Sequence, residues 1–355
     1  MAELKVTELL ETMAQAGGSD LYIATGSPPR MNVEGKMRDL KPEPLSPEDT
    51  GQIIRQLLTE QQWDQFLQTH ELNMAYSLSD RARFRVNAYF QRGTPASVIR
   101  QIRIKIPTSQ QLNLPAILET LILSPRGLIL VTGATGTGKS TTMAAMIEHR
   151  ASQMDGHIVT IEDPIEFLFE HKKSLVTQRE VGMDTLSFKE ALRNSLRQAP
   201  NVIYIGELRD AETVEFALHS AETGHLVLST LHSTNVPQSI ERVLNFFPRD
   251  YHAQVSIQLS YNLRAIICQR LIPTETGNRL PVLEILVNSG FAQEVIQKGD
   301  LGRLKEIMES GKQEGMQTFD LHLKDLVGKG VISEENALKF ADSASDLRLK
   351  LRGFV

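Results

Sequence analysis

The chain has 355 residues, of which 41% are hydrophobic and 23% charged, so it is long enough for two or three domains with sizeable cores. Its net charge of −5 excludes a polycation built for nucleic acids or acidic membranes. A single cysteine, Cys268, excludes a disulfide framework and a cysteine-rich zinc site, and it fits a reducing cytoplasm.

The sequence predicts neither a signal peptide nor a membrane span. The first ten residues contain Glu3 and Glu8 and lack a long apolar core. No stretch approaches the run of about 18 apolar residues that a spanning helix requires. We therefore expect any contact with a membrane to go through a partner, without direct insertion.

The first part of the chain is typical of a small α+β domain. Apolar residues recur at helical spacing over residues 4–16, and Ser46 is expected to cap a helix from about Pro47 to Leu58. The strands expected in this part are at residues 21–23, 31–33, 82–90 and 97–106. The pattern predicts a domain over residues 1–105, followed by a polar, proline-bounded linker at residues 106–115.

From residue 116 the pattern changes to apolar strands that alternate with helices. The expected strands are at residues 127–132, 157–161, 202–205 and 226–231. Such alternation predicts a parallel sheet covered by helices, in a core domain over residues 116–288. Residues 289–355 are expected to be helical, with helices near residues 304–308, 320–327 and 334–340.

Residues 133–140 read Gly-Ala-Thr-Gly-Thr-Gly-Lys-Ser, which is the G-x-x-x-x-G-K-S phosphate loop between an expected strand and an expected helix. Its glycines let backbone N–H groups turn inward around phosphates. Lys139 can reach the β- and γ-phosphates, and Ser140 can ligate Mg²⁺. The predicted nucleotide-binding residues of this segment are Gly133, Thr135, Gly136, Thr137, Gly138, Lys139, Ser140 and Thr141.

Two further apolar strands end in acidic residues. Glu162 and Asp163 follow the strand near residue 158, and Glu207 follows the strand at 202–205. Ligands of open α/β sheets collect at the carboxyl ends of strands, so these acids are expected to face the nucleotide. Glu207 is the favoured residue to position or deprotonate water, and Glu162 is a second candidate base. Predicted Mg²⁺ ligands, direct or through water, are Ser140, Glu162 and Glu207.

Two histidines, His225 and His232, flank the expected strand at 226–231. A histidine beside a nucleotide could sense the γ-phosphate, because its hydrogen bonding depends on what it faces. Metal binding is an alternative, although no third soft ligand is near in sequence. Either residue could also be an ordinary core histidine.

The most basic stretch runs from Arg81 to Lys105 and contains no aspartate or glutamate. Arg81, Arg83 and Arg85 share one strand face by their spacing of two. Arginines on one face repel each other unless they meet anions. The phosphates of a neighbouring subunit's nucleotide, a nucleic acid and plain solvent remain as alternatives.

Together these segments resemble the type IV pilus retraction ATPases (PilT/PilU type) of the bacterial secretion ATPase family. The resemblance runs over nearly the whole chain. Besides the phosphate loop, the segments that carry it are residues 18–22, 28–29, 83–87, 160–166, 178–181, 206–210, 221–225, 315–320 and 341–348.

The resemblance implies a PAS-like N-terminal domain, a RecA-like P-loop ATPase core and a homo-hexameric ring. It implies a Mg²⁺-dependent ATPase motor for pilus retraction and twitching motility, cytoplasmic and peripheral at the inner membrane. The implied partners are an inner-membrane pilus platform protein and a paralogous retraction ATPase, with no nucleic acid. It also implies that Arg85, Arg100 and His232 act in catalysis and that His225 contacts the nucleotide.

The C-terminal third favours an accessory, PilU-like motor. Residues 291–306 lack the Ala-Ile-Arg-Asn-Leu-Ile-Arg-Glu-like motif of the principal PilT-type motor. The absence of a four-cysteine zinc motif argues against the extension and type II secretion branch. The alternatives are a principal retraction motor, a nucleic-acid translocase and a non-hydrolysing ATP-dependent switch.

Overall fold

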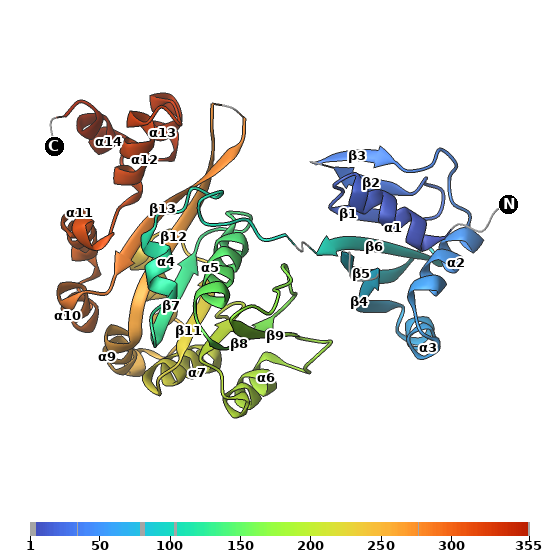
Figure 1. Ribbon diagram of the computed structural model, residues 1–355, viewed down its shortest axis with the longest axis horizontal. Coiled ribbons are helices and arrows are strands. Elements are labelled where there is room, and N and C mark those ends of the chain that lie inside the picture. Colours follow the sequence, from blue (N-terminus) through green and yellow to red (C-terminus); the bar gives the residue numbers. More distant parts are fainter. Residues whose placement is uncertain (1–4, 34, 79–81, 103–104, 276, 354–355) are drawn as a thin grey trace. The chain divides into compact units, whose positions relative to one another are not determined.

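Two separate sheets organise the chain, and each belongs to a unit with its own core (Figure 1). The first unit comprises residues 1–105 and 166–168, and the second comprises residues 106–165 and 169–355. The expected α/β fold class is confirmed. The computed structural model describes residues 5–33, 35–78, 82–102, 105–275 and 277–353.

The sheet of the first unit is antiparallel and has the strand order β3-β2-β1-β6-β5-β4. Its strands are β1 (Asp20–Ile23), β2 (Arg30–Val33), β3 (Lys36–Asp39), β4 (Glu71–Leu78), β5 (Ala82–Gln91) and β6 (Thr94–Ile102). Its helices are α1 (Val6–Gln15), α2 (Pro47–Leu57) and α3 (Glu60–Thr69). One hydrophobic cluster joins the buried sides of these helices to alternate residues of the strands.

Alternation along β5 decides which of its side chains face this core. Phe84 and Val86 are fully buried, whereas Arg83 and Arg85, which alternate with them, are only half-buried. The third arginine expected on this face, Arg81, lies outside the described residues. The arginine-bearing face is therefore the face turned away from the hydrophobic cluster.

Helix α2 begins where the sequence predicts, because Ser46 forms a reciprocal cap. The Ser46 hydroxyl accepts from the Asp49 N–H at 3.1 Å, and the Asp49 carboxylate accepts from the Ser46 N–H at 2.8 Å. These bonds satisfy two N–H groups that would otherwise have no partner at the helix start. The same serine hydrogen bonds lower the pKa of Asp49, which keeps the cap charged.

The sheet of the second unit has seven strands in the order β13-β12-β7-β11-β10-β8-β9. All neighbours pair in parallel except β12 and β13, which form an antiparallel hairpin. Its strands are β7 (Gly127–Thr132), β8 (Gly156–Glu162), β9 (Ser174–Glu180), β10 (Val202–Ile205), β11 (Leu226–Leu231), β12 (Leu263–Pro273) and β13 (Arg279–Val287).

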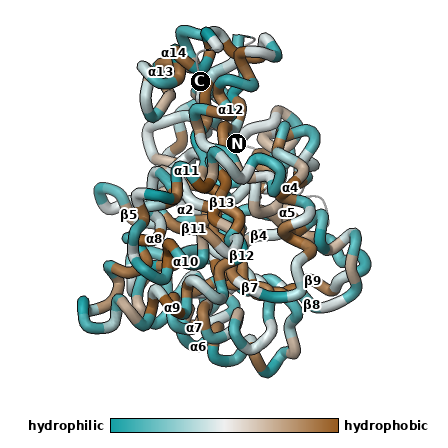
Figure 2. Tube along the Cα trace, turned by 90° about the vertical axis from the view of Figure 1, so that its left-hand side faces the viewer, coloured by the Kyte–Doolittle hydropathy of each residue, from teal (hydrophilic) through white to brown (hydrophobic). Residues whose placement is uncertain are grey.

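Both faces of this sheet are buried. Alternate residues of β7 enter different hydrophobic clusters, with Leu128 and Leu130 in one and Ile129 and Val131 in the other. Figure 2 shows the resulting hydrophobic run along the central strands. A strand buried on both faces has a continuous apolar sequence, which is why β7, β10 and β11 were predictable within a residue.

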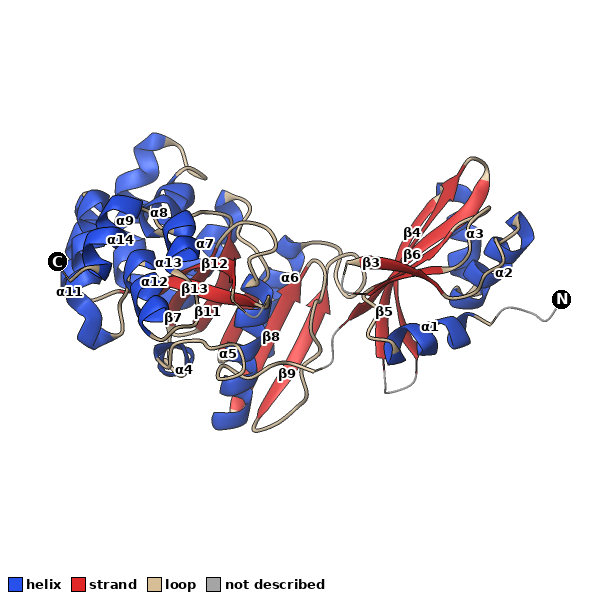
Figure 3. Cartoon of the chain, turned by 90° about the horizontal axis from the view of Figure 1, so that it is seen from above, coloured by secondary structure: helices blue, strands red, loops and turns tan. Residues whose placement is uncertain are grey.

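Helices flank the strands of this sheet (Figure 3). They are α4 (Ile117–Ile122), α5 (Lys139–Gln153), α6 (Phe188–Ser195), α7 (Ala211–Glu222), α8 (Val236–Leu244), α9 (His252–Asn262), α10 (Gly290–Lys298), α11 (Leu304–Ser310), α12 (Phe319–Gly328), α13 (Glu334–Phe340) and α14 (Ala344–Leu351). The expected C-terminal helices are present as α11 to α13. In the described parts of the chain, no helix is both long and apolar enough to span a bilayer.

We expect replacement of Ser46 by alanine to lower the free energy of unfolding of the first unit by about 1 kcal/mol, because the hydroxyl that accepts from the Asp49 N–H is lost. Urea titration can follow Trp63, the single tryptophan, which packs against the core of this unit. Replacement of the exposed Gln52 in the same helix by alanine is the control. Equal losses in the two variants would contradict the role of the cap.

Candidate active site

The phosphate loop occupies the turn between β7 and α5. The strand is buried along its whole length and ends at Thr132, and the helix begins at Lys139. Gly136 and Gly138 have φ angles of +78° and +86°, a left-handed conformation that side-chain-bearing residues rarely adopt. The two glycines therefore allow the tight curl that turns backbone N–H groups inward.

Lys139 folds back onto the first half of the loop. Its ammonium donates to the carbonyl oxygens of Gly133 at 2.7 Å and Ala134 at 3.0 Å. It also lies 3.5 Å from Nδ1 of His232. The side chain is only 9% exposed, so its charge is held between loop carbonyls and a histidine beneath the surface.

Parallel pairing brings the next strand ends to the same edge. β7, β11 and β10 lie side by side and run in one direction, so the residues that follow them emerge together. His232 follows β11 directly, and Glu207 follows β10 after Gly206. The structure therefore gathers Lys139, His232 and Glu207 at one edge of the sheet.

His232 bridges Lys139 and Glu207. Its Nε2 lies 3.2 Å from Oε1 of Glu207, while its Nδ1 faces the Lys139 ammonium. An ammonium only donates and a carboxylate only accepts. A neutral His232 that carries its proton on Nε2 satisfies both neighbours at once, so the partners select that tautomer.

Arg209 extends this group toward β8. Its Nε donates to Oε2 of Glu207 at 2.8 Å, and its Nη1 donates to Asp163 at 3.1 Å. The Glu207 hydrogen bond is the main cause that raises the pKa of Arg209, so the guanidinium stays charged. One connected row thus runs from Lys139 through His232, Glu207 and Arg209 to Asp163.

Glu162 occupies a different environment from Glu207. As the last residue of β8 it is 6% exposed, and its Oε1 accepts from the Thr160 hydroxyl at 2.7 Å and from the Gln178 amide at 3.3 Å. The Glu207 side chain is 23% exposed. Asp163, the next residue, accepts from Arg209 and so belongs to the connected row.

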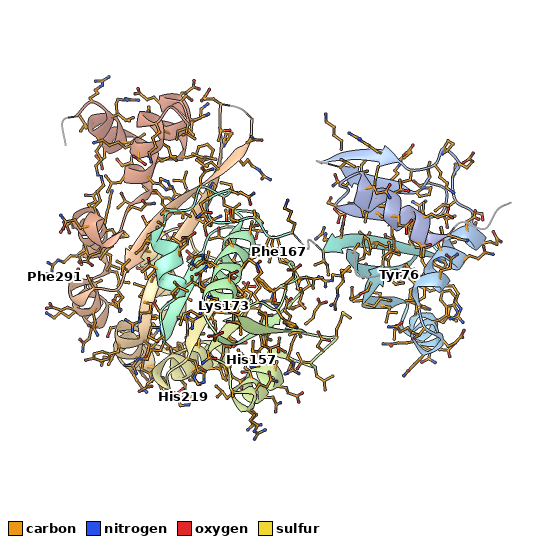
Figure 4. The ribbon with its side chains drawn as sticks, in the orientation of Figure 1. Tyr76, His157, Phe167, Lys173, His219 and Phe291 are labelled. Carbon is orange, nitrogen blue, oxygen red and sulfur yellow. The ribbon has the colours of Figure 1, made fainter. Side chains whose placement is uncertain are left out.

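His225 lies away from this group. It precedes β11 and therefore sits at the amino end of the strand, whereas the phosphate loop follows the carboxyl end of β7. His157, labelled in Figure 4, marks the same amino-terminal edge through the pairing of β8, β10 and β11. Six strand residues separate the two edges by about 20 Å. Within one chain the structure does not bring His225 to Lys139.

His225 instead has local partners. Its Nδ1 lies 3.0 Å from the carbonyl oxygen of Ser220 and 3.4 Å from the Thr223 hydroxyl. Its own carbonyl accepts from the Gly127 N–H at 3.0 Å. These contacts connect the end of α7 with the starts of β7 and β11, which is a structural position.

Arg85 and Arg100 belong to the first unit. They are directly opposite each other on β5 and β6, so both side chains are on one face of that sheet. Asp20 on β1 is next in the same row, and its carboxylate accepts from Nε of Arg100 at 2.7 Å. That hydrogen bond is the main cause that raises the pKa of Arg100. Arg103, in the same basic stretch, lies outside the described residues.

A cavity of about 700 Å³ opens beside the phosphate loop. Gly138 and Thr141 line it at the loop, and Leu112, Leu271 and Leu280 are among its apolar lining residues. This size and mixture of apolar walls with a few polar groups are typical of small-molecule sites. The cavity thus borders the end of the loop and the first turn of α5.

The oxygen donors at this edge fit Mg²⁺ better than a transition metal. Across the part of the chain that the structure describes, no group of three or more His, Cys, Asp or Glu residues could hold a metal by itself. Mg²⁺ does not need such a cage, because it is usually bound by one or two protein oxygens, waters and substrate phosphates. The Ser140 hydroxyl and the carboxylates of Glu162 and Glu207 are donors of this type.

Arg209 was not among the site residues predicted from the sequence, although its guanidinium links the strand-end acids Glu207 and Asp163. The available signal was its place two residues after Glu207, next to the helix cap Asp210. Gln178 was also missed as a partner of Glu162, because β9 is largely polar and was not recognised as a strand. Asp210 caps α7, because its carboxylate accepts from the Thr213 N–H at 2.8 Å.

Glu284 on β13 is a buried acid close to the site. Its Oε1 accepts from the N–H of Val236, the first residue of α8, at 2.7 Å. Burial is the main cause that raises the pKa of Glu284 to about 7, and the Val236 hydrogen bond opposes the shift. The charged groups that also act on it are Asp342, Arg270 and Asp320.

The chain is similar to known pilus proteins over nearly its whole length. A family model described as type II/IV secretion system protein matches residues 52–338. The type IV pilus ATPase PilU of Pseudomonas aeruginosa is 49% identical over 350 residues, with 98% of this chain and 92% of that protein covered. The type IV pilus retraction ATPase PilT of the same organism is 42% identical over 334 residues, with 94% and 97% covered.

Solved structures agree with these relatives. The pilus retraction motor PilT with bound ADP has a TM-score of 0.90 and 39% identity, with 98% of this chain and 99% of that chain covered. The ATPase DotB of Legionella pneumophila has a TM-score of 0.78 and 28% identity, with 95% and 96% covered. The similarity therefore covers the phosphate loop, both sheets and the C-terminal helices.

Glu284 should make stability fall as pH rises. Its folded pKa of about 7 lies above the ordinary 4.5, so its contribution is complete below about pH 4.5 and is lost as pH rises through 7. Glu284→Gln removes this dependence. Between about pH 5 and pH 8, we expect the wild type to lose about 3 kcal/mol of unfolding free energy relative to the variant.

Urea denaturation followed by circular dichroism at both pH values measures the difference. Replacement of the exposed Glu215 by glutamine is the matched control and should leave the pH dependence of the wild type in place. A Glu284→Gln variant with the wild-type pH dependence would show that this carboxyl does not titrate as inferred.

Proposed function

The chain belongs to the type II/IV secretion system family of ATPases, and we propose that it is a PilU-type accessory motor that hydrolyses ATP to drive type IV pilus retraction. The PilU relative is more similar than the PilT relative, at 49% against 42% identity. The observation that carries the proposal is the connected row from Lys139 to Asp163, because it places a hydrolytic set of side chains beside a phosphate loop.

ATP binding uses the loop and the neighbouring cavity. The phosphates take the loop N–H groups, and the adenosine enters the cavity against Leu271 and Leu280. Lys139 then exchanges the carbonyls of Gly133 and Ala134 for phosphate oxygens. Charge-assisted hydrogen bonds are roughly twice as strong as those to neutral carbonyls, so the exchange is favourable.

Glu207 is the proposed base that orients and deprotonates the attacking water. It is more exposed than Glu162, and its carboxylate lies in the row that reaches Lys139. Glu162 has Thr160 and Gln178 as partners beneath the surface, which suits a residue that supports the site through water. Ser140, with these two carboxylates, would hold Mg²⁺, which neutralises charge on the phosphates.

His232 is the proposed γ-phosphate sensor. It accepts from Lys139 on one nitrogen and donates to Glu207 with the other. When Lys139 turns toward a phosphate, Nδ1 of His232 loses its donor, and the position of Glu207 is affected through the same ring. The state of the phosphate and the readiness of the base are thereby coupled.

Arg85 and Arg100 are proposed to complete the site of a neighbouring subunit in a homo-hexameric ring. Arginine charge offsets the charge that develops on the transferred phosphoryl group. His225 is proposed to contact nucleotide only in such a ring, because its own loop lies at the other edge of the sheet. The proposed output is movement of residues 1–105 against the ATPase core over residues 116–288, with residues 106–115 as the linker and residues 289–355 as a C-terminal helical region.

The proposed setting is the cytoplasmic side of the inner membrane. A platform protein of the pilus would receive the motion, and a paralogous retraction ATPase would work with this ring. No nucleic acid is expected in this function, since the net charge of the chain is −5.

Lys139→Ala is expected to reduce ATP turnover by about a hundredfold or more, since it removes a cation that stabilises transition-state charge. Phosphate release by the purified protein, alone and beside its partner ATPase, measures this. Replacement of the exposed Lys173 by alanine (Figure 4) is the matched lysine control. In cells, the deletion strain complemented with Lys139→Ala should not regain the retraction that the wild-type gene restores.

The Glu207→Gln variant tests whether Glu207 acts as a base or only as a hydrogen-bond partner of Arg209. The amide keeps a partner for Arg209 but cannot take a proton, so we expect turnover to fall by about a hundredfold with ADP affinity retained. Glu162→Gln should have a smaller effect on turnover. The opposite ranking would transfer the role of base to Glu162, and full turnover in both variants would remove the hydrolytic assignment.

A further inference from the structure

We propose that Gln269 is a positioning residue that presets the phosphate loop for phosphate binding. The inference rests on the proposed binding of ATP at this loop. Gln269 belongs to β12, which pairs in parallel with β7 so that Cys268 is level with Thr132, the residue before the loop. Its side chain therefore starts from the strand beside the point where the loop leaves the sheet. The residue is 3% exposed.

Both ends of the Gln269 amide are used. Nε2 donates to the carbonyl oxygen of Thr137 at 2.7 Å, and Oε1 accepts from the Thr142 hydroxyl at 2.7 Å. The Thr137 carbonyl can only accept, so the amide nitrogen must face it. The side chain thus joins the loop to the first turn of α5 in one defined orientation.

The hydrogen bond from Gln269 to the Thr137 carbonyl sets the direction of the Gly138 N–H, a group that would donate to a bound phosphate. A trans peptide is planar, and its C=O and N–H point in opposite directions. Because Gln269 holds the Thr137 carbonyl toward β12, the N–H of Gly138 in the same peptide points away from β12. Inward-pointing N–H groups of this kind form the anion cradle of a phosphate loop.

The loop backbone packs closely against Gln269 at two glycines, Gly133 at its start and Gly138 near its end. A Cβ added at Gly133 would meet the Gln269 carbonyl oxygen at 2.5 Å, and one added at Gly138 would meet Nε2 at 2.9 Å. The two glycines let the loop backbone approach Gln269 more closely than any other residue type would. Gln269 therefore contacts the loop at its start, at Thr137 and at its end.

The affinity for ADP compared with adenosine tests the inference. Gln269→Leu keeps the bulk of the side chain but removes both hydrogen bonds, and isothermal titration can measure Mg·ADP and adenosine in turn. We expect ADP to bind about tenfold more weakly, which corresponds to one lost hydrogen bond of ordinary strength. Adenosine has no phosphate, so its affinity should stay within about threefold of wild type.

Two further variants separate loop positioning from simple packing. Gln269→Glu keeps the acceptor for Thr142 but places an oxygen against the Thr137 carbonyl. It should therefore lower the affinity for ADP at least as much as Gln269→Leu does. Thr142→Val breaks only the hydrogen bond from the Thr142 hydroxyl to Oε1 of Gln269. The affinity for ADP should then stay within about threefold of wild type. If Thr142→Val weakens ADP as much as Gln269→Leu, packing rather than loop positioning is responsible, and the inference fails.

The outcomes distinguish this inference from the function on which it rests. If the wild type does not bind ADP, or Lys139→Ala binds it as tightly, the proposed nucleotide site itself is wrong. If Lys139→Ala weakens ADP binding but both Gln269 variants bind ADP as tightly as the wild type, only the positioning role is overturned. If both Gln269 variants lose affinity for ADP and for adenosine to the same extent, a role confined to the phosphates is likewise refuted.

Discussion

The parallel, in-register pairing of β7, β11 and β10 is the constraint on which the site depends. Leu226 on β11 is level with both Gly127 on β7 and Val202 on β10, so the three strands start at one level. Because each strand is buried on both faces, a slip of one residue would exchange its two hydrophobic sets. The fit of these particular side chains in their two clusters therefore sets the level at which Lys139, His232 and Glu207 leave the sheet.

Charge alternates along the row that these strand ends create. Lys139 and Arg209 are cations, Glu207 and Asp163 are anions, and the His232 ring links the two halves. The row is therefore close to neutral without a nucleotide. Phosphates add negative charge at the Lys139 end, so the balance changes first at the loop and then at His232. This order gives a physical basis for coupling between nucleotide binding and Glu207, the proposed base.

The sequence was most informative where function depends on local order along the chain. The phosphate loop and the acid after β10 were recognisable because a strand, a turn and a helix follow one another directly. His225 shows the limit of such reasoning. It occurs near His232 in sequence, but a six-residue strand lies between them and places them at opposite edges of the sheet.

The β12–β13 hairpin was not predictable in this way, because its importance comes from contacts far apart in sequence. Gln269 on β12 contacts the phosphate loop 132 residues away, and Glu284 on β13 contacts the start of α8 48 residues away. Thr137 and Val236 lie in the two segments that carry Lys139 and His232. One antiparallel hairpin thus contacts both the segment that carries Lys139 and the segment that carries His232. A displacement of the hairpin would move Thr137 and Val236 together, so β12 and β13 hold the segments that carry Lys139 and His232 in one arrangement.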